Sequence, residues 1–169
     1  MRLLQLFTVA AVIALLSFKA SPQLTVTSTS FTNNGNIPLK YSCEGQKINP
    51  PLQISQLPAN TRSLALILHD PDAPMQGGFT HWVVWNIPLD GKIDEDYKGA
   101  DQGLNGAQQK GYVGMCPPSG THHYHFMVFA LDTKLALAPG TNKAQLETAM
   151  KGHILAQGDL VGLYKKQNP

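Results

Sequence analysis

Short apolar runs alternate with clusters of turn residues along most of the chain. Residues 24–31 (LTVTSTSF) alternate between apolar and polar side chains and are rich in β-branched residues. Residues 63–69 (SLALILH), 81–87 (HWVVWNI) and 124–131 (YHFMVFAL) are mostly apolar, as buried strands would be. Because Pro, Gly and Asn separate these runs, the pattern predicts a mostly β domain, either a sandwich or a barrel.

One helix is predicted near the C-terminal end. Asn142 has the properties of an N-cap, and Gln145 lies where a capping box requires it. Gly152 is expected to stop or kink the helix. Apolar residues recur at helical spacing at Leu146, Ala149, Met150 and Ile154. Residues 99–114 instead contain five glycines and little apolar pattern, so we predict a long loop, which in compact domains is often functional.

The first twenty residues have a different pattern. Arg2 precedes a mostly apolar run over residues 3–18, and Lys19 and small residues follow it. This order is typical of a secretory signal peptide, and the run is short for a bilayer, which needs about 20 residues. We therefore predict a signal peptide at residues 1–20 and one secreted or periplasmic domain at residues 21–169, without a transmembrane segment. An uncleaved membrane anchor is the alternative.

The charge of the predicted domain excludes some partners. Of the 13 Lys and Arg residues, Arg2 and Lys19 lie in the predicted signal peptide, which leaves eleven basic residues against 11 acidic ones. A neutral domain without a Lys or Arg cluster has no electrostatic hold on nucleic-acid phosphates. We therefore expect no nucleic-acid partner and no polybasic contact with a membrane.

The chain has two cysteines, Cys43 and Cys116. Disulfides persist in secreted and periplasmic proteins, and an even number of cysteines favours pairing in that setting. The predicted export of the chain therefore predicts a disulfide between Cys43 and Cys116.

The stretch HDPDAPMQGGFTHWVVWNIP, residues 69–88, joins an apolar run to two carboxylates. In an extended Asp70-Pro71-Asp72 segment the two carboxylates point to roughly the same side. Burying them beside His81 would be costly unless the charges were used, which favours a functional site. An ordinary solvated turn is the alternative.

The stretch GYVGMCPPSGTHHYHF, residues 111–126, has three histidines in four positions. A metal site would need three or four converging ligands. On a strand, however, His123 and His125 share one face and His122 lies on the other. Asp70 or His81 would have to complete such a site.

A nucleophile in the same stretch is a second interpretation. No G-x-S-x-G elbow is present, and Ser119 lies in a Pro-Gly turn, where Ser is common for backbone reasons. Cys116 is the better candidate, since several histidines follow it closely in sequence. A disulfide with Cys43 would remove that thiol.

An anion pocket is the third interpretation. Gly114 lets the backbone approach a ligand, and amides of a Gly-rich turn form a nest for an anion. His81 and His122 are donors, and Tyr124 adds a hydroxyl. Asp70 fits such a site if it orients His81 or favours its charged form, or if the ligand also carries a cation.

Three segments in this order resemble one family. D-P-D-A-P, then G-F-x-H-W-x-V-x-N-I-P, then G-Y-x-G-x-C-P-P-x-G-x-H-x-Y-x-F are similar to the phosphatidylethanolamine-binding protein family, in its bacterial, Raf-kinase-inhibitor-like branch. The resemblance covers residues 24–164 and implies a β-sandwich of two sheets with a few short peripheral helices. It also implies one small pocket for phosphate-like groups, lined by Asp70, Asp72, Pro74, His81, Gly114, Pro117, His122 and Tyr124.

The predicted signal peptide and the resemblance together predict a secreted or periplasmic protein, not an enzyme, that binds a small anionic ligand or a phospholipid headgroup without a cofactor. It leaves a regulated protein partner open, including one whose acidic group the pocket recognises. The alternative from another class is a metal- or thiol-dependent hydrolase that uses the same pocket.

Strand periodicity separates the histidines of the second motif. If the strand begins by residue 122, His122 and Tyr124 face the pocket, and His123 and His125 face away. A pocket histidine near carboxylates and phosphate is expected to hold its proton more tightly than a free one.

Overall fold

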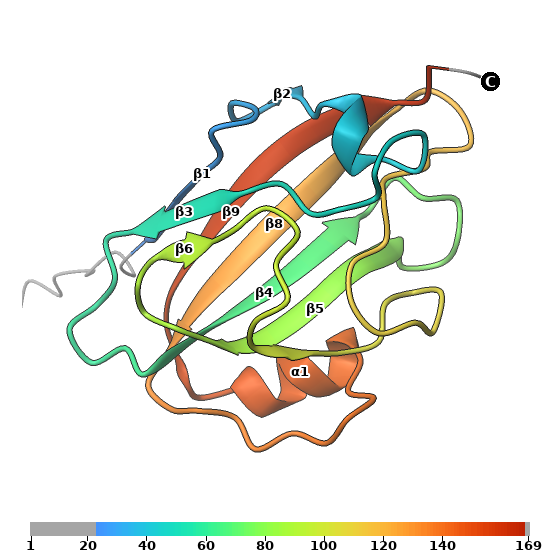
Figure 1. Ribbon diagram of the computed structural model, residues 1–169. Helices are drawn as coiled ribbons and strands as arrows, with labels where there is room; N and C mark the ends of the chain where they lie inside the picture. Colours follow the sequence, from blue (N-terminus) through green and yellow to red (C-terminus); the bar gives the residue numbers. More distant parts are fainter. Residues whose placement is uncertain (1–22, 168–169) are drawn as a thin grey trace, which may run out of the picture.

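The computed structural model describes residues 23–167 of the chain. These residues form two packed β-sheets (Figure 1). The larger sheet has the strand order β2 (Gly35–Asn36), β9 (Ile154–Lys165), β8 (Thr121–Leu131), β4 (Ser63–Asp70), β5 (Phe79–Ile87) and β7 (Asp101–Gln102). The smaller sheet has the order β1 (Thr25–Thr27), β3 (Leu52–Ser55) and β6 (Lys92–Ile93). The predicted mostly β sandwich is therefore confirmed, whereas the predicted signal peptide lies outside the described residues.

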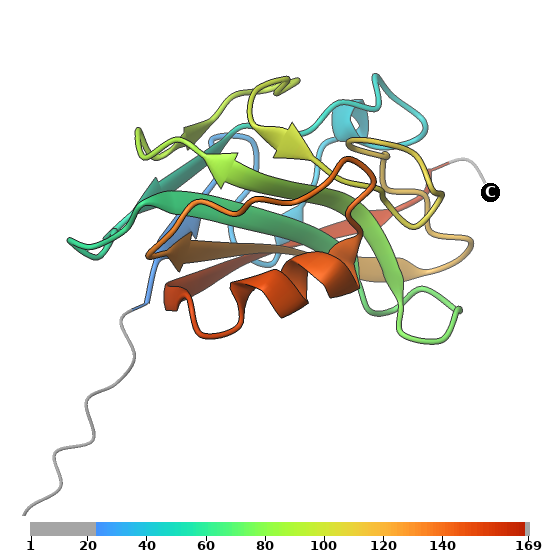
Figure 2. The same ribbon diagram turned by 90° about the horizontal axis from the view of Figure 1, so that it is seen from below.

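β4 lies at the centre of the larger sheet and packs on both faces. Leu64, Leu66 and Leu68 belong to the core between the two sheets. Ala65 and Ile67 alternate with them and belong to a second core on the opposite face. Figure 2 shows α1 covering that face, away from the smaller sheet. This double burial explains why the strand is continuously apolar.

The predicted helix is present but shorter than its apolar pattern. α1 (Lys143–Met150) begins with Asn142 as N-cap, and the Asn142 and Gln145 side chains form the reciprocal bonds of a capping box. It ends at Met150, and Ile154 already begins β9, so the inclusion of Ile154 in the helix was wrong. A 3₁₀ helix, η1 (Leu39–Tyr41), is the other helical element of residues 23–167.

β9 is a strand that the apolar pattern did not predict. Its inward side consists of alternate residues, but two of them are glycines. A Cβ at Gly158 would lie 2.5 Å from the Leu24 carbonyl oxygen, and one at Gly162 would lie 2.5 Å from the Ile37 side chain. The tight approach of neighbouring segments therefore requires glycine where a strand pattern would show an apolar side chain.

The two ends of the long antiparallel pair β8–β9 define two ends of the molecule. Thr121 pairs with Lys165 at one end of the pair, and Leu131 pairs with Ile154 at the other. Gln23 bridges to Gln157 toward the second end, so the described chain begins there (Figure 1). The end of β4 and the starts of β5 and β8 lie together at the first end. The two sequence motifs are therefore brought together at this end of the central strands.

The loop predicted at residues 99–114 is largely irregular and contains only β7 and an isolated bridge between Leu104 and Lys110. The predicted strand at residues 24–31 is reduced to β1. Among the helices of residues 23–167, none has the length and apolar character needed to cross a membrane.

Candidate ligand-binding site

A pocket of about 360 Å³ opens at the end of the central strands where the two motifs meet. Five of the residues that the resemblance implied line it: Asp70, Pro74, His81, Gly114 and Pro117. The remaining wall is mostly apolar and consists of Ala73, Met75, Phe79, Val113, Cys116 and Pro118. The pocket therefore combines a small polar base with apolar sides.

Asp70 lies at the base of the pocket and is only 2% exposed. Its Oδ2 accepts a hydrogen bond from Nδ1 of His122 at 2.8 Å, and its Oδ1 accepts one from the Asp72 backbone N–H at 2.9 Å. The expectation that Asp70 orients His81 was therefore wrong, because the carboxylate orients His122 instead. The two partners hold both oxygens in place.

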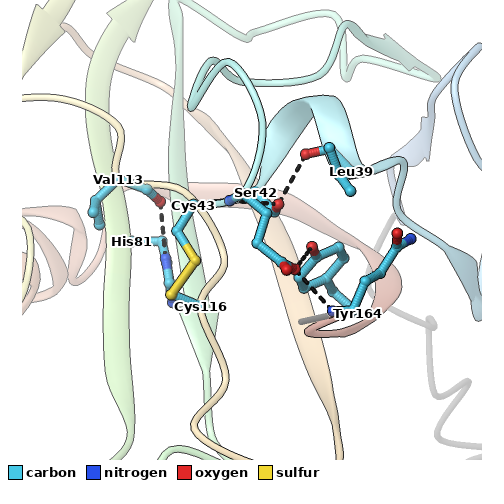
Figure 3. Close-up of a disulfide and its surroundings, with 9 residues drawn as sticks. Leu39, Ser42, Cys43, His81, Val113, Cys116 and Tyr164 are labelled. Carbon is cyan, nitrogen blue, oxygen red and sulfur yellow. Dashed lines mark hydrogen bonds between the residues drawn. A yellow bond between two sulfur atoms is a disulfide. The ribbon is translucent and has the colours of Figure 1, made fainter. Parts of the chain in front are cut away.

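His81 is oriented by the backbone of the opposite wall. Its Nδ1 lies 2.9 Å from the Val113 carbonyl oxygen (Figure 3), and since a carbonyl only accepts, the proton is on Nδ1. Burial lowers the pKa of His81 to about 4, and the Val113 carbonyl and Asp70 offset this only in part. Burial therefore outweighs the effect of the Asp70 carboxylate on His81, whereas the expectation of a more tightly held proton beside a phosphate stays a prediction. The ring is neutral at pH 7, and Nε2 is an acceptor.

Tyr124 lies behind the two histidines. Its ring meets His81 edge-on, with centroids 5.2 Å apart, and stacks on His122 at 6.5 Å. Its hydroxyl is buried and forms no hydrogen bond of good geometry, although it lies close enough to the Asp70 carboxylate to interact with it. Burial and the nearby Asp70 carboxylate raise the pKa of Tyr124, so the hydroxyl keeps its proton. A buried donor without a well-formed hydrogen bond is unusual in a protein interior.

The structure separates Asp72 from this cluster. The exposed Asp72 carboxylate accepts hydrogen bonds from the backbone N–H and from Nδ1 of His123, at 2.8 and 2.7 Å. The prediction that both carboxylates point to the same side was therefore wrong: Asp70 bonds His122 on the buried face, and Asp72 bonds His123 on the exposed face. This pairing also lowers the pKa of Asp72.

The predicted register of β8 is confirmed. His122 and Tyr124 are buried, whereas His123 is exposed and His125 is half-buried. His125 bonds Asp159 of β9 through Nδ1 at 2.7 Å, so it has its own partner away from the pocket. None of these four residues is in the lining of the pocket, so contact of His122 and Tyr124 with a ligand stays a prediction, although the register is confirmed.

A disulfide braces one wall of the pocket. Cys43 and Cys116 are joined with an S–S distance of 2.09 Å, which confirms the predicted pair (Figure 3). The Cys43 N–H donates to the Met115 carbonyl at 2.9 Å. A Cβ on Gly114 would lie 2.7 Å from the Ser42 carbonyl carbon, so glycine permits this approach. Because Cys116 is bonded, a thiol-dependent reaction has no free nucleophile here.

The apolar walls were missed by reasoning from the sequence. The ring of Phe79 meets His81 edge-on, with centroids 4.8 Å apart, and Met75 is 50% exposed at the mouth. Phe79 lies two residues before His81, on the same side of β5, which was the available signal. In residues 23–167, no set of three or more His, Cys, Asp or Glu side chains is arranged to hold a metal ion.

Comparison with known proteins finds one family. Residues 27–165 match the family described as phosphatidylethanolamine-binding protein. A UPF0098 protein of Pyrococcus horikoshii is 49% identical over 152 residues, which cover 83% of this chain and 76% of that protein. A UPF0098 protein of Chlamydia muridarum is 43% identical over 147 residues, or 83% of this chain and 98% of that protein.

Two solved structures have the same fold. The crystal structure of CT736 from Chlamydia trachomatis, described as a homolog of phosphatidylethanolamine-binding protein, superposes with a TM-score of 0.83 and 42% identity. That match covers 87% of this chain and 100% of CT736. YbcL of E. coli, described as a new member of the mammalian family, has a TM-score of 0.79 and 30% identity, over 86% of this chain and 99% of YbcL.

Proposed function

Because the chain belongs to the phosphatidylethanolamine-binding protein family, we propose that its pocket binds the phosphate-bearing headgroup of a phospholipid or a small phosphorylated molecule of similar shape. The ligand would enter at this end of the central strands and meet Asp70 and His81 at the base of the pocket. Asp72, which faces away, is excluded from the proposed contacts.

One observation supports this proposal above the others. Asp70, His81 and His122 are at most 7% exposed, and the buried Tyr124 hydroxyl beside them forms no hydrogen bond of good geometry. Burying polar groups costs free energy unless each one has a partner. No packing role requires such a cluster beneath an open pocket. A ligand that contacts Asp70 and His81, which line the pocket, and reaches past them to the Tyr124 hydroxyl would explain it.

The proton positions indicate what the ligand must carry. Asp70 and the neutral Nε2 of His81 accept hydrogen bonds, and Tyr124 is the neighbouring donor. A ligand with a primary ammonium near a phosphate, or with a protonated phosphate, offers both donors and acceptors. The apolar walls around Phe79 and Met75 suit the carbon chain of such a molecule.

The proposal includes a location outside the cytoplasm, either secreted or periplasmic. The signal-peptide pattern of residues 1–20 supports it, and so does the disulfide, because disulfides persist in oxidising compartments. Fractionation of cells that express the full chain tests this part. Recovery in the cytoplasm, with both cysteines reduced, would contradict it.

Replacement of Tyr124 by Phe tests the binding proposal. We expect Tyr124→Phe to weaken O-phosphoethanolamine binding by about tenfold, while the melting temperature stays constant or rises, since the hydroxyl has no well-formed hydrogen bond to lose. Titration calorimetry and thermal unfolding measure the two effects. Tyr41→Phe is the control: its hydroxyl bonds Glu95 at 2.7 Å, so it should lose stability and keep binding.

Phosphocholine provides the matched probe, because its ammonium has no N–H group. We expect it to bind more weakly than O-phosphoethanolamine. If neither probe binds the wild-type protein, or if Tyr124→Phe binds as well as wild type, the proposed contacts are wrong.

A further inference from the structure

A second pocket, of about 290 Å³, lies on the other side of the loop wall that forms the first one. Lys110, Gly111 and Tyr112 line it, whereas Val113 and Gly114 line the first pocket. It is therefore a separate cavity that shares one segment with the site described above.

Three loops each bring a lysine to this second pocket. Lys47 comes from the segment after η1, Lys98 from the segment between β6 and β7, and Lys110 from the long loop. Asp96 is the one acidic residue in the lining, and its carboxylate lies 2.6 Å from Nζ of Lys98. Within residues 23–167, Lys47 and Lys110 have no ion-pair partner. Three lysines and one aspartate give the lining a net positive charge, although Asp90 and Asp94 lie close enough to Tyr97 to raise its pKa.

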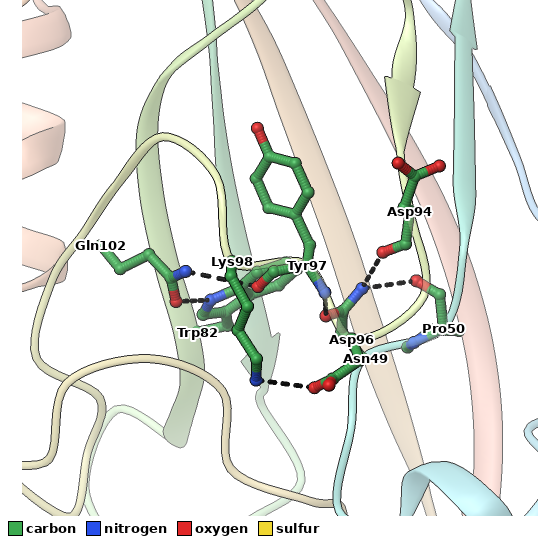
Figure 4. Close-up of polar contacts among 8 residues, drawn as sticks. All are labelled: Asn49, Pro50, Trp82, Asp94, Asp96, Tyr97, Lys98 and Gln102. Atoms are coloured by element: carbon green, nitrogen blue, oxygen red, sulfur yellow. Dashed lines mark hydrogen bonds and ion pairs between the residues drawn. The ribbon is translucent and has the colours of Figure 1, made fainter.

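A network of hydrogen bonds holds the base of this pocket rigid. The buried Asn49 side chain accepts from the Tyr97 N–H at 2.7 Å and donates to the Asp94 and Pro50 carbonyls at 2.8 and 2.9 Å (Figure 4). One side chain therefore fastens two of the three loops together. The backbone segments that carry Lys47 and Lys98 are therefore held in place before a ligand binds, which lowers the entropic cost of binding.

The third loop is fastened to the same frame through Gln102. Its Oε1 accepts from the Trp82 indole N–H at 2.9 Å, and its amide donates to the Tyr97 carbonyl at 3.4 Å (Figure 4). Tyr97 and Tyr112 meet the Trp82 ring edge-on, with centroids 6.4 and 5.8 Å away. The Tyr97 and Tyr112 rings line the cavity, whereas the buried Trp82 ring packs behind them.

The backbone of Lys47 is strained. Its φ of 57° lies in the left-handed region, which a lysine rarely adopts. Such outliers persist where the surrounding structure imposes them, and they cluster at ligand-binding sites. Asp96, in the same lining, also has a left-handed φ, of 55°, as do five non-glycine residues outside the pocket.

We propose that this second pocket binds a small anion with two or more acidic groups, either phosphates or carboxylates. Three cations from separate loops line a cavity of ligand size, and a ligand with several acidic groups could pair with more than one of them. Lys98 is available to such a ligand, because its pair with Asp96 is exposed and such pairs are weak. The chemistry differs from that of the first pocket, whose base holds a buried carboxylate and a neutral histidine.

An NMR titration of the purified protein tests the proposal, with pyrophosphate and citrate as probes at low ionic strength. We expect chemical-shift changes at Lys47, Tyr97, Lys98 and Gly111. The variant Lys47→Gln/Lys110→Gln should bind about tenfold more weakly, since it removes two close charge pairs, and added salt should weaken wild-type binding. Binding of one probe alone would assign the acidic group as phosphate or carboxylate.

The variant Lys134→Gln/Lys151→Gln is the matched control, because it removes the same charge from exposed positions outside the pocket. It should keep wild-type affinity for the polyanion. The pocket variant should also keep its melting temperature and its binding of O-phosphoethanolamine. Equal weakening in both double variants, shifts confined to the first pocket, or binding of neither probe would overturn the proposal.

Discussion

The hydrogen bond from His81 to the Val113 carbonyl decides what this residue offers a ligand. With Nδ1 occupied and a pKa of about 4, the buried ring presents an acceptor at neutral pH. An anion without hydrogens therefore meets a lone pair until His81 gains a proton. Binding of such an anion should raise the pKa of His81 and take up one proton.

Sulfate is a suitable probe of this linkage, because its charge is constant between pH 4 and 8. We expect sulfate binding to strengthen as the pH falls from 7 toward 4, by at most about tenfold per pH unit for a single proton. The sign follows because the bound state holds more protons than the free state in this range. NMR titrations at pH 5, 6 and 7 measure it.

His81→Asn provides the control for this prediction. Its amide can donate to the Val113 carbonyl but does not titrate, so the pH dependence attributed to His81 should disappear. A wild-type affinity that is constant from pH 7 to 5 would contradict the assignment of His81 as the proton acceptor.

At the level of residues, local periodicity predicted the orientation of side chains but not their partners. The burial of His122 and Tyr124 followed from the two-residue repeat of a strand. The bond between Asp70 and His122 joins residues 52 positions apart, and the pKa of His81 depends on how deeply the fold buries it. Neither property has a local signal.

At the scale of elements, the wall at residues 111–118 depends on the segment that braces it. Gly114 packs directly against the backbone of Ser42 and Cys43, at distances that leave no room for a Cβ. Gly114→Ala should therefore push the wall outward, with a loss of about 1–3 kcal/mol in stability. O-phosphoethanolamine affinity should fall with it, as calorimetry and chemical denaturation can show.

Gly152→Ala separates this effect from general destabilisation. Nothing lies within 4 Å of a Cβ there, but the φ of 81° is unfavourable for alanine, at a cost of about 1 kcal/mol. It should therefore lose stability without loss of affinity. Unchanged affinity in Gly114→Ala would mean that the brace does not shape the pocket.

The elements that the sequence predicted are those with strong local patterns. β4, β5, β8 and the capping box of α1 lie where their apolar runs and cap residues indicated. β9 was not predicted, because close contacts with other segments require Gly158 and Gly162 where a strand pattern would show apolar side chains. The lysine pocket escaped for a related reason, since its three lysines are far apart in sequence and only the loops bring them together.

At the scale of the whole molecule, the disulfide closes a loop with a sequence separation of 73 residues. Chain-entropy arguments assign a loop of this length about 4 kcal/mol of stabilisation, although measured gains are often smaller. We therefore expect Cys43→Ser/Cys116→Ser to unfold at clearly lower denaturant concentration than wild type. Denaturation under oxidising and reducing conditions measures the difference. Equal midpoints for the variant and the oxidised wild type would contradict the prediction.

The antiparallel pairing of β8 and β9 has a practical consequence for attaching the protein to a surface. Gln23 lies beside Gln157, about 20 Å along β9 from Tyr164 at the pocket end. Gln167 donates its N–H to Glu44, which follows Cys43 of the disulfide that braces the pocket wall. A tether joined before residue 23 would therefore hold the domain with its pocket turned outward, toward whatever the solution delivers. A fusion joined after residue 167 would begin on the side of the disulfide wall, so biosensor experiments should immobilise the N-terminal side.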